Sequence, residues 1–187
     1  YFTPASNTKI LTLATYLNLN LPNIPSFQYQ KDNNQLHLIP LGDPTFLHPE
    51  FKTQPGYTSL TSLLTDTLIL HPPLTPIPHF GPGWSWDDYP YYYSAENSPF
   101  PIYGNTTRVT LVSCKPQLIP KAFEKNMVLD TLSKKLHRKR SQNLYYLNPR
   151  ILNKKDTLYI PFITSDSLFI SLLLSLIHIS EPTRPLY

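Results

Sequence analysis

The sequence has little of what a metal centre or a disulfide framework needs. It contains one cysteine, Cys114, which excludes an internal disulfide and any zinc site built from several thiolates. The six histidines show no H-E-x-x-H or similar spacing, so each is interpreted as a surface residue or a hydrogen-bonded loop residue. We therefore expect neither a metal ion nor another cofactor.

Long hydrophobic runs and repeats are also missing. The most apolar stretch, residues 168–179, is shorter than the roughly 20 residues that a transmembrane helix requires. The net charge of +4 comes mainly from residues 134–140. We interpret this run as a solvated connection, because no nucleic-acid recognition fold accompanies it. The alternatives are binding of nucleic acid and contact with an anionic cell-wall polymer. No membrane span and no nucleic-acid partner are expected.

What is present is typical of a globular domain. Hydrophobic residues make up 41% of the 187-residue chain and aromatic residues 13%, enough for one domain with a sizeable core. Short apolar or alternating segments predict strands near residues 27–29, 35–39, 105–114, 144–147 and 157–162, and helices over residues 57–70 and 123–136. Strands this short and closely connected favour an α+β fold over a parallel doubly wound sheet.

The beginning of the chain predicts an amphipathic helix. Thr3 is a good N-cap and Pro4 suits the first helical position, so the helix is predicted to begin at Thr3. Its apolar side chains recur at helical spacing, and we expect this face to pack into a core. The face consists of Ile10, Leu11, Leu13, Ala14 and Leu17.

Ser6 and Lys9 are candidate catalytic residues of this helix. They lie three residues apart, so their side chains are expected on the same side, near the positive end of the helix dipole. A serine hydroxyl becomes a nucleophile when a neighbouring base takes its proton, and a partly desolvated lysine can serve as that base. The N–H groups of the same turn can help to hold an oxyanion. The alternative is an ordinary helix start.

Three strings narrow the interpretation. Residues 2–9, Phe-Thr-Pro-Ala-Ser-Asn-Thr-Lys, resemble the nucleophile helix of the penicillin-binding proteins and serine β-lactamases, whose motifs are S-x-x-K, S-x-N and K-T-G. Residues 41–47 resemble the G-D-P-T-L element of class C D-alanyl-D-alanine carboxypeptidases; we interpret Asp43 there as a turn residue that caps the following segment. Residues 83–89, Gly-Trp-Ser-Trp-Asp-Asp-Tyr, resemble the P-G-W-x-W-[DN]-D segment of the same family.

The third string carries the candidate substrate-binding residues. In the class C penicillin-binding family, an acid of this motif and an aromatic residue five positions later line the pocket for the free amino end of the stem-peptide side chain. These positions are Asp88 and Tyr93 here. A carboxylate pairs with an ammonium group, and a ring supplies an apolar wall and a cation–π face. The alternative assigns Asp87 and Asp88 to a turn and the aromatic residues to the core. A core position is what we expect for Trp84 and Trp86.

The resemblance covers residues 1–174. It implies an incomplete β-lactamase/transpeptidase-like catalytic domain with an inserted β-rich subdomain, truncated at both ends. K-[ST]-G occurs nowhere, and Ser141-Gln142-Asn143 is a chance match to S-x-N. Because Tyr1 is not Met, we expect the native N-terminus upstream. Residues 175–187 resemble translated sequencing-adapter read-through, so a non-native tail is expected.

The function implied is a serine-type D-Ala-D-Ala carboxypeptidase of the periplasm or cell envelope. It is expected to cleave peptidoglycan stem peptides through an acyl-enzyme on Ser6, with endopeptidase activity left open, and to be inhibited covalently by β-lactams. The 187-residue chain itself is expected to be inactive, since it lacks two of the three motifs. The alternatives are a β-lactamase or esterase on the same helix, or a non-catalytic wall-binding protein that uses the aromatic run at residues 89–93.

Overall fold

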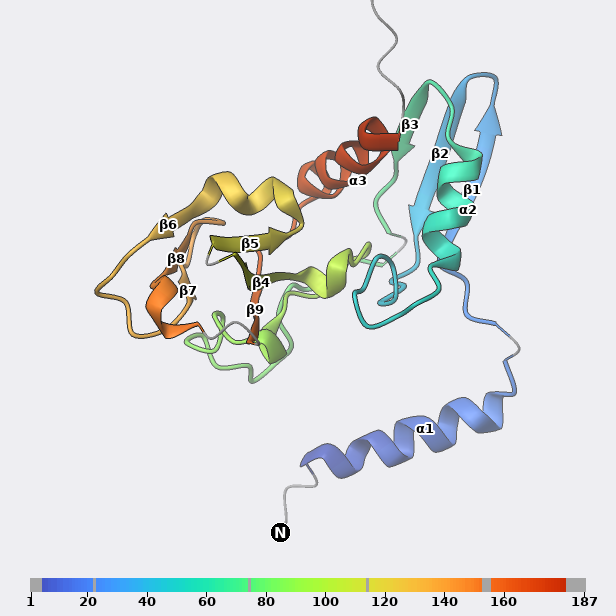
Figure 1. The fold of residues 1–187 in the computed structure, drawn as a ribbon. Helices are drawn as coiled ribbons and strands as arrows, with labels where there is room; N and C mark the ends of the chain where they lie inside the picture. The colour runs from blue at the N-terminus through green and yellow to red at the C-terminus, as the bar shows by residue number, and fades with distance from the viewer. Residues whose placement is uncertain (1–4, 22, 74, 114, 153–155, 181–187) are drawn as a thin grey trace, which may run out of the picture.

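The computed structural model describes residues 5–21, 23–73, 75–113, 115–152 and 156–180. Within these residues the chain forms three α-helices and three small sheets of three strands each (Figure 1). The fold is thus mixed α and β, with short strands and small sheets, as the sequence predicted. The described strands do not form a parallel doubly wound sheet.

The helices lie at the two ends of the described chain and after the second strand. They are α1 (Thr8–Leu19), α2 (Pro55–Leu63) and α3 (Asp166–Ser180). Short 3-10 helices occur at Ala5–Asn7, Tyr92–Ser94, Tyr103–Asn105, Lys121–Asn126 and Pro149–Ile151. No described helix is long and apolar enough to cross a membrane.

The first sheet has the order β1-β2-β3, with β1 at Phe27–Asp32, β2 at Gln35–Pro40 and β3 at Thr67–Leu70. β1 pairs with β2 antiparallel, and β2 pairs with β3 parallel. Alternate residues of β2 are buried, as its alternating sequence predicted. The core includes Leu36 and Leu38 from this strand and Leu60 from α2, which Figure 1 shows beside the sheet.

The helix predicted over residues 57–70 is wrong in its second half. α2 starts at Pro55, a residue that suits the first helical turn, and ends at Leu63. Residues 67–70 instead pair with β2, which places Leu68 and Leu70 opposite Leu36 and Leu38. Pairing with an existing strand satisfies the backbone of this β-branched and apolar segment, and this outweighs the helical spacing of Leu68 from Leu60 and Leu64.

The second and third sheets come from the rest of the chain. The second has the order β5-β4-β9, all antiparallel, formed by Lys115–Ile119, Thr106–Val112 and Thr157–Pro161. The third has the order β6-β8-β7, formed by Met127–Leu129, Tyr145–Leu147 and His137–Arg138. The strands predicted near residues 105–114, 144–147 and 157–162 are confirmed, although Cys114 lies outside the described residues. The helix predicted over residues 123–136 is wrong: a 3-10 helix ends at Asn126, and the next three residues pair as β6 with β8.

Three phenylalanines lie together at the junction of α3 with the preceding loops. The ring centroids of Phe100 and Phe169 are 4.0 Å apart, and those of Phe46 and Phe100 are 4.9 Å apart. All three side chains are buried. Because Phe169 belongs to α3 and Phe46 to the turn after β2, these contacts hold the first sheet's loops to the C-terminal helix.

α1 does not contribute to this core. Its predicted apolar face is exposed, with Ile10, Leu11 and Leu17 each about two-thirds accessible. Figure 1 shows the helix apart from the sheets and from α2 and α3. The expectation that this face packs inward is therefore wrong for the described chain: local spacing is enough to form the helix, but burial requires a partner. The predicted N-cap, Thr3, lies outside the described residues.

Candidate functional site

The predicted nucleophile and base lie at the exposed start of α1. Ser6 belongs to the 3-10 helix that precedes α1, and Lys9 is the second residue of α1. Both side chains are exposed. Within the described chain, neither has a hydrogen bond to Asp88 or Tyr93, so the structure does not bring the two halves of the predicted site together.

Asp88 and Tyr93, in contrast, contact each other. The Tyr93 hydroxyl donates a hydrogen bond of 3.2 Å to Oδ1 of Asp88, which is half-buried. Desolvation, and after it the carboxylate of Asp88, raise the pKa of the Tyr93 hydroxyl above its usual value. The ring of Tyr91 stacks on that of Tyr93 with centroids 5.5 Å apart and an interplanar angle of 5°. A carboxylate beside stacked rings is a suitable surface for an ammonium group.

Successive turns produce this arrangement. The N–H of Asp88 donates to the carbonyl of Ser85, the N–H of Tyr91 to that of Asp88, and the N–H of Ser94 to that of Tyr91. The hydroxyl of Ser85 also donates to Oδ1 of Asp87 at 2.6 Å, and this bond lowers the pKa of that carboxyl. Asp87 and Asp88 are thus turn residues, as the alternative interpretation proposed, and the turns are what aim Asp88 at Tyr93.

The two tryptophans are not core residues. Trp84 is 42% exposed and Trp86 is 69% exposed, which corrects the expectation from sequence. Trp84 lies edge-on to Phe80 with centroids 6.1 Å apart and presses on Gly81, where an added Cβ would lie 2.6 Å from the indole Nε1. A larger residue at position 81 would therefore displace the indole of Trp84.

The basic run is a solvated connection only in part, because Lys134, Lys135, Lys139 and Arg140 are exposed but Arg138 is buried. We call residues 84–93 the aromatic segment and residues 134–140 the basic segment. Each of three cations of the basic segment lies near a ring of the aromatic segment. The distances to the ring centroids are 5.1 Å from Lys135 Nζ to Tyr91, 5.4 Å from Arg138 Cζ to Tyr89 and 4.7 Å from Arg140 Cζ to Trp86.

Among these three cations, the side chain of Arg138 is buried and held by hydrogen bonds. Its side chain is 2% exposed, and Nη1 donates to the carbonyls of Lys139, Arg140 and Gln142. Burial lowers the pKa of the Arg138 guanidinium, an effect that Tyr145, Glu96 and Tyr89 oppose. The side chain thus orders the turn that follows β7 and presents Arg140 to Trp86.

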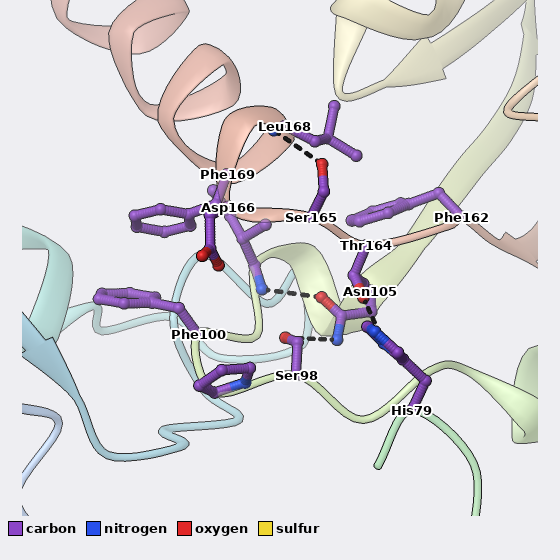
Figure 2. A pocket seen from close by; sticks show the side chains of 12 residues that line it. His79, Ser98, Phe100, Asn105, Phe162, Thr164, Ser165, Asp166, Leu168 and Phe169 are labelled. Carbon is purple, nitrogen blue, oxygen red and sulfur yellow. Dashed lines mark hydrogen bonds between the residues drawn. The ribbon is translucent and has the colours of Figure 1, made fainter. Parts of the chain in front are cut away.

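A small hollow whose lining is mostly apolar, with a few polar groups at one side, lies where β9 leads into α3 (Figure 2). Thr164 and His79 approach each other there, with 3.1 Å between Oγ1 and Nδ1. Asn105 donates to the hydroxyl of Ser98 at 3.0 Å and accepts from the N–H of Ile102 at 3.2 Å. The volume of about 40 Å³ holds little more than a water molecule. These polar groups therefore join loops and do not form a substrate pocket.

Two other sequence features have structural explanations. Asp43 accepts from the N–H and the hydroxyl of Thr45 and from the hydroxyl of Ser26, which confirms its role as a capping residue. Partial burial raises the pKa of Asp43, but these hydrogen bonds outweigh it, so the net pKa lies below the usual value. Asn143, in the formal S-x-N match, exchanges hydrogen bonds with the backbone of Ile163 at 3.0 and 2.7 Å.

Comparison of the chain with family models, curated proteins and solved structures found no match in any of the three. Among the described residues, no group of three or more His, Cys, Asp or Glu side chains is placed to hold a metal ion. Sequence reasoning missed the role of Arg138 and Arg140. Their positive charge was visible, but the rings that they contact lie about fifty positions earlier, and no local pattern connects the two segments.

Proposed function

We propose that this chain is part of a serine-type D-Ala-D-Ala carboxypeptidase of the cell envelope, with a transpeptidase-like catalytic domain. The proposal rests on the S-x-x-K string at residues 6–9, on the two further strings of the same family, and on one structural observation. That observation is the hydrogen bond between Tyr93 and Asp88, the two positions that the resemblance assigns to one substrate pocket.

The chemistry assigned to Ser6 is acyl transfer. Its Oγ attacks the carbonyl carbon of the D-Ala-D-Ala bond while Lys9 Nζ accepts the hydroxyl proton. That proton then passes to the leaving amine, and the terminal D-alanine departs as the C–N bond breaks. Water later hydrolyses the acyl ester and regenerates the hydroxyl. Because Lys9 is exposed here, its action as a base requires that a further part of the protein cover it.

Asp88 and Tyr93 supply recognition in this proposal. The Asp88 carboxylate pairs with the free ammonium of the stem-peptide side chain, and the Tyr93 ring forms a wall beside it. The hydrogen bond from Tyr93 holds the carboxylate in place before the substrate arrives, which reduces the entropy lost on binding.

The exposed rings also favour a second function, non-catalytic wall binding. Tyr92 is 67% exposed and Trp86 is 69% exposed, and aromatic surfaces of this kind mark binding sites. A wall-binding protein needs neither Ser6 nor Lys9. It is therefore distinguished from the carboxypeptidase by the nucleophile alone.

The test is covalent labelling of the protein encoded by the complete parent gene. A labelled penicillin is expected to form an adduct at Ser6, because the strained amide presents the same acyl carbon to the same hydroxyl. Ser6→Ala is expected to abolish the adduct, and Lys9→Ala to slow its formation by about 10² or more. The 187-residue chain is expected to label weakly or not at all. If peptide mapping places the adduct on another serine, or finds none in folded protein, the wall-binding function replaces this one.

A further inference from the structure

A second hollow lies between the aromatic and basic segments. Its volume is about 460 Å³, within the range of small-molecule sites. Aromatic rings and guanidinium groups from distant parts of the chain line it. The lining includes Trp84, Trp86, Tyr89, Arg138, Arg140 and Ser141.

The positive charge of this hollow is only partly neutralised, because one carboxylate, that of Glu96, lines it beside two guanidinium groups. Among the described residues, no carboxylate lies within 4.0 Å of the guanidinium of Arg138 or Arg140, and the one ion pair within that distance joins His79 to Glu96. Glu96 also lines the hollow, but its Oε2 accepts from both the N–H and the hydroxyl of Thr164. The two guanidinium groups outnumber the one carboxylate, and this excess of positive charge favours an anionic ligand.

Donor groups in the hollow remain available to a ligand. Arg140 is exposed, and its guanidinium lies over the face of the Trp86 ring. Ser141 is exposed beside it, and its hydroxyl has no hydrogen bond to another described residue. Arg138 contributes charge from a fixed position, since three carbonyls hold its Nη1. A guanidinium and a neighbouring hydroxyl together match a carboxylate or a phosphate.

The tryptophans define the rest of the ligand. Trp84 and Trp86 both line the hollow and both remain substantially exposed. An exposed indole provides a flat apolar surface that matches the C–H face of a sugar ring. We propose that this hollow binds an acidic saccharide, with the sugar ring against the tryptophans and the acid group on Arg140 and Ser141.

Nucleic acid fits the hollow less well. A single strand needs a basic groove that follows its phosphates over several nucleotides, with rings on which successive bases stack. Here two guanidinium groups line a single hollow together with the carboxylate of Glu96, and the described residues form no longer groove with them. This arrangement fits a ligand that carries one acid group beside one sugar ring.

The chain offers a direct readout, because Trp84 and Trp86 are its only tryptophans. Their fluorescence is titrated with trigalacturonic acid, which carries carboxylates, and with glucose 6-phosphate, which carries a phosphate. The neutral counterparts are trigalacturonic acid methyl ester and glucose. Saturable quenching is expected with at least one acidic sugar, and at least tenfold weaker binding with its neutral counterpart. The acidic sugar that binds shows which anion the site accepts.

Arg140→Gln is the informative variant. We expect it to weaken binding of the acidic sugar by about tenfold or more, since it removes a charge-assisted hydrogen bond. The matched control is Arg150→Gln, an exposed arginine outside the hollow, with binding expected to stay at the wild-type level. Calorimetry repeats the titration of the Arg140 variant, because the substitution alters the surroundings of Trp86. Arg138 is not substituted, since its loss removes three hydrogen bonds of the fold.

Three results would overturn the proposal in protein whose circular dichroism shows it to be folded. The first is that neither acidic sugar gives a saturable response. The second is that acidic and neutral sugars bind equally well, and the third is that the Arg140→Gln variant binds the acidic sugar as tightly as the wild type does. Tighter binding of a thymidine decanucleotide than of either acidic sugar would likewise overturn it, and would assign the hollow to nucleic acid.

Discussion

Glu96 and Thr164 are joined by two hydrogen bonds across 68 positions of sequence. Oε2 of Glu96 accepts from the N–H of Thr164 at 2.7 Å and from its hydroxyl at 2.8 Å. The Glu96 side chain is nearly buried, and His79 Nδ1 lies 3.5 Å from the same oxygen. These contacts tie the loop that follows the aromatic segment to the junction of β9 and α3.

We expect Glu96→Gln to lower the free energy of unfolding by about 1 to 3 kcal/mol. A neutral amide oxygen is a weaker acceptor than a carboxylate, and the new amide N–H₂ group has to be accommodated in a site that offers donors. Urea denaturation monitored by circular dichroism measures the change. The matched control is Glu124→Gln at an exposed position, with an expected change within about 0.5 kcal/mol. Equal stability of both variants would show that the bonds to Thr164 contribute little.

In the protein encoded by the complete gene, Asp88→Asn is expected to lower kcat/KM selectively. The loss should be about tenfold to a hundredfold for stem peptides with a free side-chain amine, because the pair that we propose between Asp88 and this amine would be worth about 1.5 to 3 kcal/mol. Simple D-Ala-D-Ala peptides should be affected much less.

The neighbouring carboxylate provides the control for that experiment. Asp87 is exposed, and its carboxylate accepts from Ser85 within the same turn. Asp87→Asn is therefore expected to leave the ratio of kcat/KM for the two substrates unchanged. Equal losses on both substrates in the Asp88 variant would assign Asp88 a structural role only.

The buried hydroxyl of Tyr145 is expected to make the folded protein less stable at alkaline pH. Burial raises the pKa of its hydroxyl from 10.0 to about 12, against the smaller opposing effects of the hydrogen bond with Thr107 and the charge of Arg138. A group whose pKa is higher in the folded state contributes stability below its unfolded pKa. That contribution is lost as the pH rises from about 10 to about 12.

The measurement is a tyrosine absorbance titration of the folded protein. The part of the curve near pH 12 should lose one tyrosine in Tyr145→Phe relative to the wild type. A curve whose upper end is the same in Tyr145→Phe and the wild type would contradict the raised pKa.

Local patterns predicted those parts of the fold that one strand or turn can form with near neighbours. The alternation at residues 35–39 predicted β2, and the Gly-Asp-Pro sequence predicted the turn that Asp43 caps. The prediction was wrong at residues 67–70, which form β3. The spacing of Leu68 from Leu60 and Leu64 fits a helix, but the partners of β3 in β2 lie about thirty positions earlier.

The candidate site likewise has contacts that follow from local sequence and contacts that do not. The five-residue spacing of Asp88 and Tyr93 places both within a run of turns, so their contact follows from local geometry. The positions of Ser6 and Lys9 at the start of α1 are also local. No pattern within ten residues indicates that Trp86 is exposed or that Arg140 lies against it, since each depends on the other segment.

The sequence by itself determined that the chain has enough apolar residues for a core, that its strands are short, and that α1 is helical. These properties depend on side-chain spacing and on backbone preferences within a few residues. Only the tertiary structure decided that Arg138 is buried, that Trp84 and Trp86 are exposed, and that the apolar face of α1 has no partner in the described chain. Burial is a relation between segments: a side chain leaves water only where another part of the chain supplies the contacts and hydrogen bonds that replace it.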